Sequence, residues 1–172
     1  MPAKDQGRLN NRYMIVPRTL IFLFRGEKIL LIKGDSKKKI WAGCYNGIGG
    51  HVERGESIYF AAQRELVEET GLVIDNLWLC GTIMIDVYKK TGVGIFIFKG
   101  EVNEEIISTE FVNETAEGNL LWFSVDQISD LPLVEDLPIL LPKIIANQKE
   151  DPPFSALYTY DIEGKLTVSF NK

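Results

Sequence analysis

The most informative stretch of this 172-residue sequence is GGHVERGESIYFAAQRELVEETGL, residues 49–72, in which a glycine-rich loop runs into a helix. Ser57 can cap the start of that helix, its interior has neither Gly nor Pro, and Gly71 suits its end. We therefore predict a helix over residues 57–70, preceded by a long loop of the kind that often carries function.

Three acidic side chains gather near the end of this predicted helix. At 3.6 residues per turn, Glu65, Glu68 and Glu69 fall within an arc of roughly 100°. Like charges so placed repel each other, and partial burial strengthens the effect because it disfavours the ionised form. A hard divalent cation such as Mg²⁺ would relieve the repulsion, since it binds carboxylate oxygens together with substrate phosphates. The alternative is a solvated face on which Arg64 and Glu68 form an ordinary pair one turn apart.

The flanks of the same helix are apolar. Ala61 and Ala62 lie on the side of the glutamates, whereas Phe60 and Val67 lie on the opposite side. Because the helix is apolar on both flanks, we expect it to be covered by the rest of the protein and not freely solvated.

A wider pattern decides between a metal site and a solvated face. Five residues separate Gly50 from Glu56, seven more precede Arg64, and glutamate, aliphatic and glycine residues follow at fixed offsets up to Leu72. This is the pattern G-x5-E-x7-R-E-U-x-E-E-x-G-U, where U is aliphatic, and on it the chain resembles the Nudix hydrolase family. The resemblance implies an α/β fold, an α/β/α sandwich with a mixed β-sheet, and a signature loop-helix-loop. It also implies an enzyme that cleaves a nucleoside diphosphate linked to another group.

The resemblance assigns roles to individual residues. Glu65, Glu68 and Glu69 match the metal ligands of the family, and Glu65 is also a candidate general base. Gly49 would offer its backbone carbonyl to the same ion. The implied cofactor is Mg²⁺, with Mn²⁺ as a possible substitute.

Further residues would support this site. Arg64 and Glu56 resemble the ion pair that orients the helix. Glu117 resembles a glutamate that several members use as another metal ligand or as the base, although Glu110 and Glu114 lie nearby and a solvated loop acid is the alternative. The resemblance thus leaves two candidates for the general base, Glu65 and Glu117.

Beyond the signature, the chain resembles the MutT-type branch, which hydrolyses oxidised purine nucleoside triphosphates such as 8-oxo-dGTP. The similarity covers most of residues 19–170, including YNGIGGHVERGES, LLWFSVDQISDLPLVEDLPILLPKI and the closing hairpin. It implies that Asn46 and Asp136 read the base edge, because Asn and Asp side chains present paired donors and acceptors. Thr19 is the third candidate for substrate binding. Asp136 is equally well placed to cap the helix that follows it.

One position departs from this branch. Where the vertebrate enzymes carry a tryptophan that stacks on the purine, this chain has Val134. A lost stacking platform costs roughly 1–3 kcal/mol per base, which weakens the expected preference for an oxidised purine unless Trp41, Tyr45 or Trp122 substitutes.

The rest of the chain reads as strands and one more helix within a single domain over residues 1–172, with 1–12 as a flexible tail. Residues 19–34 predict a hairpin, because a glycine-containing turn separates two apolar runs. The other predicted elements are a long hairpin at 72–88 and 94–102, a strand at 120–125, a helix over 134–148, and a closing hairpin at 155–160 and 165–170.

Composition excludes several classes of function. A net charge of -5 argues against binding a nucleic-acid polymer, whose affinity comes mostly from Lys and Arg. No apolar run approaches the roughly 20 residues needed to cross a bilayer, and the N-terminal residues lack the apolar region of a signal peptide. The cysteines, Cys44 and Cys80, have no CxxC spacing, which favours a reducing cytoplasm.

We therefore predict a cytoplasmic, metal-dependent enzyme, monomeric or homodimeric, that converts a nucleoside triphosphate to the monophosphate and pyrophosphate. The sanitising of oxidised purine nucleotides is a candidate role for it. Alternative Nudix substrates are a dinucleoside polyphosphate, for which Tyr88 is a suggestive residue, ADP-ribose or a nucleotide sugar. A catalytically silent nucleotide-binding regulator is a further alternative, which the complete set of signature carboxylates disfavours.

Overall fold

A computed structural model describes residues 12–35, 41–88, 90–103, 115 and 118–171. Every predicted strand and helix within these residues is present. The strands are β1 (Met14–Arg25), β2 (Lys28–Gly34), β3 (Tyr45–Asn46), β4 (Trp78–Tyr88), β5 (Thr91–Glu101), β6 (Gly118–Ser124), β7 (Phe154–Tyr160) and β8 (Leu166–Phe170). The helices are α1 (Ile58–Thr70), the 3-10 helix η2 (Val125–Asp130) and α3 (Leu137–Ala146).

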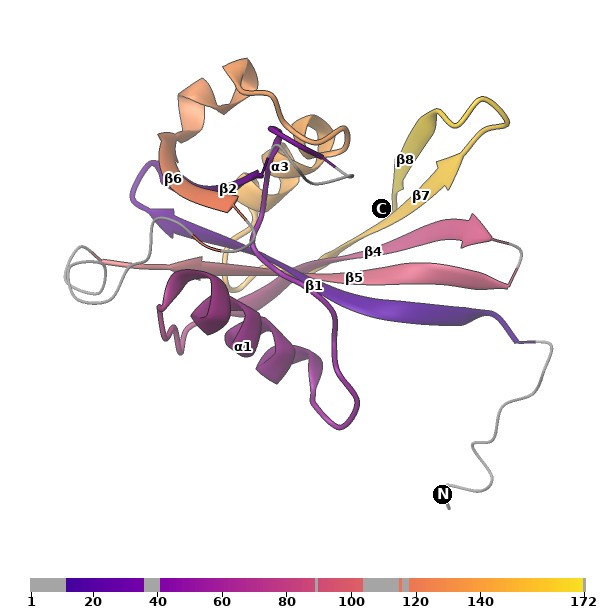
Figure 1. The fold of residues 1–172 in the computed structure, drawn as a ribbon, viewed down its shortest axis with the longest axis horizontal. Coiled ribbons are helices and arrows are strands. Elements are labelled where there is room, and N and C mark those ends of the chain that lie inside the picture. The colour runs from indigo at the N-terminus through magenta and orange to yellow at the C-terminus, as the bar shows by residue number, and fades with distance from the viewer. Residues whose placement is uncertain (1–11, 36–40, 89, 104–114, 116–117, 172) are drawn as a thin grey trace.

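The strands form one mixed sheet. Its order is β3-β2-β1-β5-β4-β7-β8, and β6 pairs with β2 off this path. β1 runs parallel to β5, and β4 runs parallel to β7, whereas the remaining pairs are antiparallel. β1 and β2 share only two residue pairs, so β2 and β6 curl away from the rest of the sheet (Figure 1).

Helices cover the two faces of this sheet, which confirms the α/β/α sandwich. Successive side chains of β1 point to opposite faces of the sheet. Its apolar run is buried because both of these faces are covered. Phe22 belongs to a cluster that includes Leu140 of α3. Its neighbour Ile21 belongs to a second cluster that includes Leu66 of α1. Figure 1 shows α1 and α3 on opposite sides of the long strands.

The rest of the protein covers α1, as expected, but on one flank only. Ala61, Ala62 and Leu66 are fully buried, but Phe60 is 65% exposed and Val67 is 42% exposed. The helix packs on the sheet through one stripe only, and its opposite side faces outward. Single apolar side chains are common on protein surfaces, so an apolar flank does not require a covering element.

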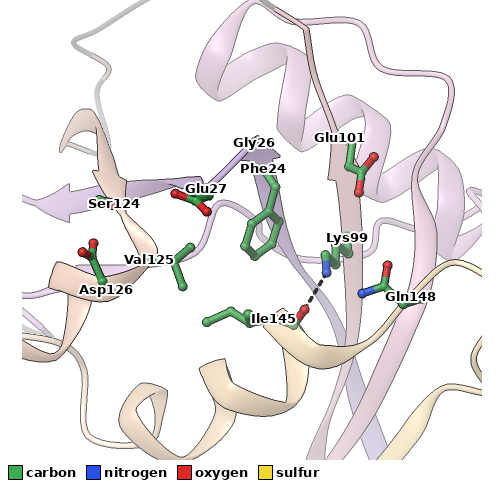
Figure 2. Close-up of a pocket in the computed structure, with 10 residues that line it drawn as sticks. All are labelled: Phe24, Gly26, Glu27, Lys99, Glu101, Ser124, Val125, Asp126, Ile145 and Gln148. Atoms are coloured by element: carbon green, nitrogen blue, oxygen red, sulfur yellow. Dashed lines mark hydrogen bonds between the residues drawn. The ribbon is translucent and has the colours of Figure 1, made fainter.

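A buried lysine ties the end of α3 to the sheet. The Nζ of Lys99 on β5 donates to the carbonyl oxygens of Ile145 at 3.0 Å and Asn147 at 2.8 Å. The ammonium also lies 4.6 Å from the centre of the Phe24 ring. Burial lowers the pKa of Lys99. Phe24, Lys99 and Ile145 border a pocket of about 590 Å³ between the sheet, η2 and α3 (Figure 2).

Among the described residues, no helix is long and apolar enough to cross a membrane.

Candidate functional site

A cleft of about 1040 Å³ collects most of the predicted site residues. The glutamates of α1 line it together with Gly49 and Gly50 of the preceding loop. Residues that are far away in the sequence line it too. These are Thr19 of β1, Asn46 of β3, Asp136 before α3 and Tyr158 of β7.

Helix α1 begins and ends as the sequence predicts. Ser57 Oγ accepts a hydrogen bond from the backbone N–H of Phe60 at 3.2 Å, which caps the first turn. Gly71 has φ 75° and donates its N–H to the carbonyl of Val67, which closes the last turn. The helix therefore holds its three glutamates at one end of the cleft. Glu69 is 7% exposed, whereas the side chain of Glu68 is 58% exposed.

Arg64 connects the helix to the loop and to two of the glutamates. Its guanidinium donates to both carboxylate oxygens of Glu56, at 2.7 and 3.2 Å, and to the His51 carbonyl at 3.0 Å. It also donates to Glu65 Oε1 at 2.9 Å and to Glu68 Oε2 at 3.2 Å. Hydrogen bonding from Arg64 lowers the pKa of Glu56, and the same contact raises the pKa of the guanidinium. The Arg64–Glu56 ion pair is thus present, and Glu56 lies outside the residues that line the cleft.

Two glycines allow the loop to approach β1 and α1 closely. Gly49 has φ 145°, and a side chain there would overlap the backbone carbonyl of Thr19. A side chain on Gly50 would overlap the carboxylate of Glu65. The Thr19 N–H donates to the Gly50 carbonyl at 2.9 Å, which fixes the loop along β1. Close packing therefore requires glycine at both positions, against the backbone of β1 at position 49 and against the Glu65 carboxylate at position 50.

The chemistry of this end of the cleft fits a hard divalent cation. It offers carboxylate oxygens from Glu65, Glu68 and Glu69, and Gly49 adds a backbone carbonyl. In the described part of the chain, no three acidic, His or Cys side chains are close enough to form a ready-made metal site. Such a spread is expected, because like charges repel each other when no cation neutralises them. Arg64 forms ion pairs with two of the three carboxylates, those of Glu65 and Glu68. Glu117 lies outside the described residues, so its assigned role stays a prediction.

The residues predicted to read a base line the same cleft. Asn46 Oδ1 accepts from the N–H of Gly47 at 2.8 Å, which fixes the orientation of the side-chain amide. Asp136 occupies the N-cap position of α3, but its side chain makes no capping hydrogen bond. Burial raises the pKa of Asp136. The structure thus places the Asp136 side chain in the cleft and not over the first turn of α3.

Of the aromatic residues that could replace the missing tryptophan, one lines the cleft. Trp41 borders it together with Val134. Tyr45 is instead buried against Phe123, with ring centres 4.9 Å apart. Trp122 packs beside the cluster under α1, where Arg25 lies 4.9 Å from its ring centre. Trp41 is therefore the candidate stacking residue.

Tyr158 is a residue of the cleft that sequence reasoning missed. It is 1% exposed, and its hydroxyl makes no hydrogen bond with the described residues. Its strand was predicted correctly, yet alternation in a strand does not show which cavity a side chain meets. A tyrosine at an inward position of a buried strand was the available signal, since the phenol group carries a polar tip.

The smaller pocket of Figure 2 lacks these features. Its residues come from β1, β5, η2 and α3, and none of them belongs to the glutamate signature. Lys99 there is already bonded to two backbone carbonyls. The larger cleft is thus the candidate functional site.

Comparison with known proteins identifies the family of the chain. The family model described as NUDIX domain matches residues 14–144, a range that contains the signature loop and all of α1.

Two groups of curated relatives are similar to the chain. The oxidized purine nucleoside triphosphate hydrolase of Mus musculus is 34% identical over 134 residues, which cover 73% of this chain and 79% of that protein. Its counterpart from Danio rerio is 32% identical over 133 residues. The NAD-capped RNA hydrolase NudC of Pseudomonas aeruginosa (strain LESB58) is 31% identical over 141 residues, and the chain covers only 47% of that longer protein.

Solved structures share the fold. A MutT protein from Bacillus halodurans superposes with a TM-score of 0.75 at 22% identity, covering 91% of this chain and 98% of the other. The NUDIX domain of Shewanella oneidensis NrtR, in a complex with ADP ribose, gives a TM-score of 0.65 at 14% identity, covering 84% and 97%.

Proposed function

This chain belongs to the Nudix family, and on that premise we propose that it hydrolyses a nucleoside triphosphate to the monophosphate and pyrophosphate with the help of a divalent cation. The proposal rests above all on the continuity of the cleft, which joins the glutamates of α1 to Asn46 and Asp136. A nucleotide has the same two parts, a polyphosphate that needs charge neutralisation and a base that presents hydrogen-bonding groups.

The carboxylate end would receive the phosphates. Glu65, Glu68 and Glu69 would hold the cation, with the backbone carbonyl of Gly49 as a further ligand. Mg²⁺ is the cation we propose, because it accepts oxygen ligands from a few carboxylates together with substrate phosphates. A bound divalent cation would neutralise charge on the phosphate oxygens and on the leaving pyrophosphate.

Glu65 is our first candidate for the general base that accepts a proton from the attacking water. Arg64 donates to its Oε1, which leaves Oε2 to take the proton. The Arg64–Glu56 pair would keep the helix, and with it Glu65, in register with the loop. Glu117 is the alternative base.

The part of the cleft lined by Asn46 and Asp136 would receive the base, and Trp41 offers an aromatic surface beside Val134. Thr19, the third candidate, also lines the cleft, where its N–H donates to the Gly50 carbonyl. The mouse relative at 34% identity is named for oxidized purine nucleoside triphosphates. We infer that oxidised purine triphosphates are among the substrates, with Trp41 in place of the missing stacking residue.

Product analysis tests the proposal directly. The purified chain would be incubated with Mg²⁺ and normal and oxidised triphosphates, and with ADP-ribose, a dinucleoside polyphosphate and a nucleotide sugar. We expect equal amounts of monophosphate and pyrophosphate from the triphosphates. Glu69→Gln should lower kcat by about 100-fold or more while nucleotide binding is retained, since removing one charge-stabilising group at such a site costs on that order.

Glu101→Gln is the matched control, because Glu101 lies at the end of β5 outside the cleft. It should hydrolyse the triphosphates at the normal rate. Cleavage of the other compounds without any pyrophosphate from triphosphates would contradict the assigned substrate. Binding without turnover in every variant would support the regulator instead.

A further inference from the structure

Two buried hydroxyl groups in the cleft have no hydrogen-bond partner. Thr19 is 3% exposed and Tyr158 is 1% exposed, and neither Oγ1 of Thr19 nor the phenol oxygen of Tyr158 is bonded to a described residue. A buried polar group without a partner costs roughly 1–3 kcal/mol. Such groups are rare in folded proteins and call for an explanation. Because both residues line the cleft, a ligand in the cleft can supply the missing partners.

Tyr158 and Asp136 line the same cleft, and the Tyr158 hydroxyl is close enough to the Asp136 carboxylate to influence its pKa. No hydrogen bond of ordinary geometry joins the two groups. Burial first, and then the charge of Asp136, raises the pKa of Tyr158, so the phenol keeps its proton. A protonated phenol can donate, whereas an ionised carboxylate can only accept. The pair therefore presents a donor next to an acceptor.

One kind of base edge complements such a pair. A lactam has a ring N–H next to a ring C=O, as in guanine, hypoxanthine, 8-oxopurines, uracil and thymine. Adenine and cytosine instead carry an amino group next to a bare ring nitrogen. The N–H of a lactam could donate to Asp136 while its carbonyl accepts from Tyr158. An adenine could donate its amino hydrogens to Asp136. Its ring nitrogen would then have to accept from Tyr158 in place of the carbonyl oxygen, and it lies at a different position.

We propose that Tyr158 is a specificity-determining residue whose hydroxyl donates to the carbonyl of a lactam-containing base while Asp136 accepts from the adjacent ring N–H. This inference rests on the proposed function, because it requires that the cleft binds a nucleotide. It extends that function by naming the substrate class, which is nucleotides whose base has a lactam edge. Both normal and oxidised bases belong to this class.

The sharpest test compares deoxyinosine and deoxyadenosine triphosphates, two purines that differ only at this edge. The wild type should show the lower KM for deoxyinosine triphosphate. Tyr158→Phe should raise that KM about five- to tenfold, the effect of one neutral hydrogen bond. It should leave KM for deoxyadenosine triphosphate and kcat for both within twofold. The melting temperature should not fall, because the substitution removes an unpartnered hydroxyl and keeps the ring.

Two further variants sharpen the comparison. Tyr59→Phe is the control, because the Tyr59 hydroxyl donates to the Asp75 carbonyl at 3.0 Å and does not line the cleft. It should leave the ratio of the two KM values unchanged. Asp136→Asn should bring the KM values for deoxyinosine and deoxyadenosine triphosphates closer together, because an amide can donate as well as accept.

The outcomes separate this inference from the proposed function. Equal effects of Tyr158→Phe on both substrates, or a wild type that hydrolyses both with the same KM, would overturn the inference and leave the hydrolase intact. Absence of pyrophosphate from every triphosphate would overturn the proposed function. In that case, binding of the two nucleotides to the wild type and to Tyr158→Phe, measured by calorimetry, decides the inference without turnover.

Discussion

Gly50 shows how closely single residues are fitted in the site. Its α-carbon packs against the Glu65 carboxylate, and the space that a side chain would need is already filled by that group. Gly50 does not have the left-handed backbone conformation that Gly49 has. The requirement for glycine at position 50 is therefore one of space, and an alanine there would act on Glu65 and not on the backbone.

We expect Gly50→Ala to lower kcat by about 100-fold while the protein stays folded, because a displacement of about 1 Å at a reacting group can cost that much. The added methyl group would push the Glu65 carboxylate out of position, and the end of a glutamate side chain can move without disrupting the core. Steady-state kinetics and circular dichroism check both parts.

Gly94→Ala is a suitable control for this experiment. An added methyl group at Gly94 would come closest to the flexible end of Ile15 on β1, at 3.1 Å, and Gly94 does not line the cleft. Normal kcat in Gly50→Ala, or a loss of the same size in Gly94→Ala, would contradict the role given to the glycine.

The residues of the site differ in how far the sequence could predict them. Glu65, Glu68 and Glu69 share a face because helix geometry fixes their spacing, so the sequence was sufficient. The contact of Asp136 with Tyr158 depends on the packing of β7 beside α3. No local pattern encodes that contact, which explains why Tyr158 was missed.

At the scale of elements, strands and helices were predicted because each has a local signal. The alternation in the long hairpin and the caps of α1 needed no knowledge of the fold. Which side of an element is covered was harder to predict. The outward flank of α1, with Phe60 and Val67, has the same local composition as a buried one.

Helix α3 depends on a contact that its own sequence does not contain. Lys99 of β5 binds the carbonyl oxygens of Ile145 and Asn147 near the end of the helix, where carbonyl groups lack partners within the helix. We expect Lys99→Met to lower the free energy of unfolding by about 1–3 kcal/mol, because it leaves buried acceptors unsatisfied. Urea denaturation measures this change.

The exposed Lys28 provides the comparison, and Lys28→Met should change the free energy of unfolding by less than about 0.5 kcal/mol. Removing Lys99 also removes a buried charge, whose desolvation opposes the loss of its hydrogen bonds. An unfolding free energy equal to that of the wild type would show that these two effects cancel and that the lysine does not stabilise α3.

In the whole molecule, one continuous segment and several segments that are distant in the sequence line the same cleft. Residues 49–72 supply the glutamates of the cleft, whereas Thr19, Asn46, Tyr158 and Asp136 come from β1, β3, β7 and the start of α3. A sequence pattern can identify the glutamates because they are close in the chain. The other residues come together only after the sheet has formed.

Metal binding should stabilise the whole fold. At ten times its dissociation constant, Mg²⁺ should add about 1.4 kcal/mol to the free energy of unfolding, provided that it binds only the folded chain. The melting temperature should therefore rise with Mg²⁺ concentration and fall back when a chelator is added.

The variant Glu69→Gln should show a smaller rise, since it removes one charged ligand from a helix that stays intact. Melting curves of the wild type that do not move across millimolar Mg²⁺ would speak against a metal site that exists without substrate.

The separate origins of the two ends of the cleft have a consequence for evolution. Asp136 and Tyr158 lie on other elements than the glutamates of α1, so substitutions there would alter the proposed base preference and leave the proposed metal ligands in place. A duplicated gene of this kind would then acquire a new substrate in small steps without passing through an inactive intermediate. Under the proposed function, the fold lets recognition diverge under selection while the chemistry is inherited unchanged.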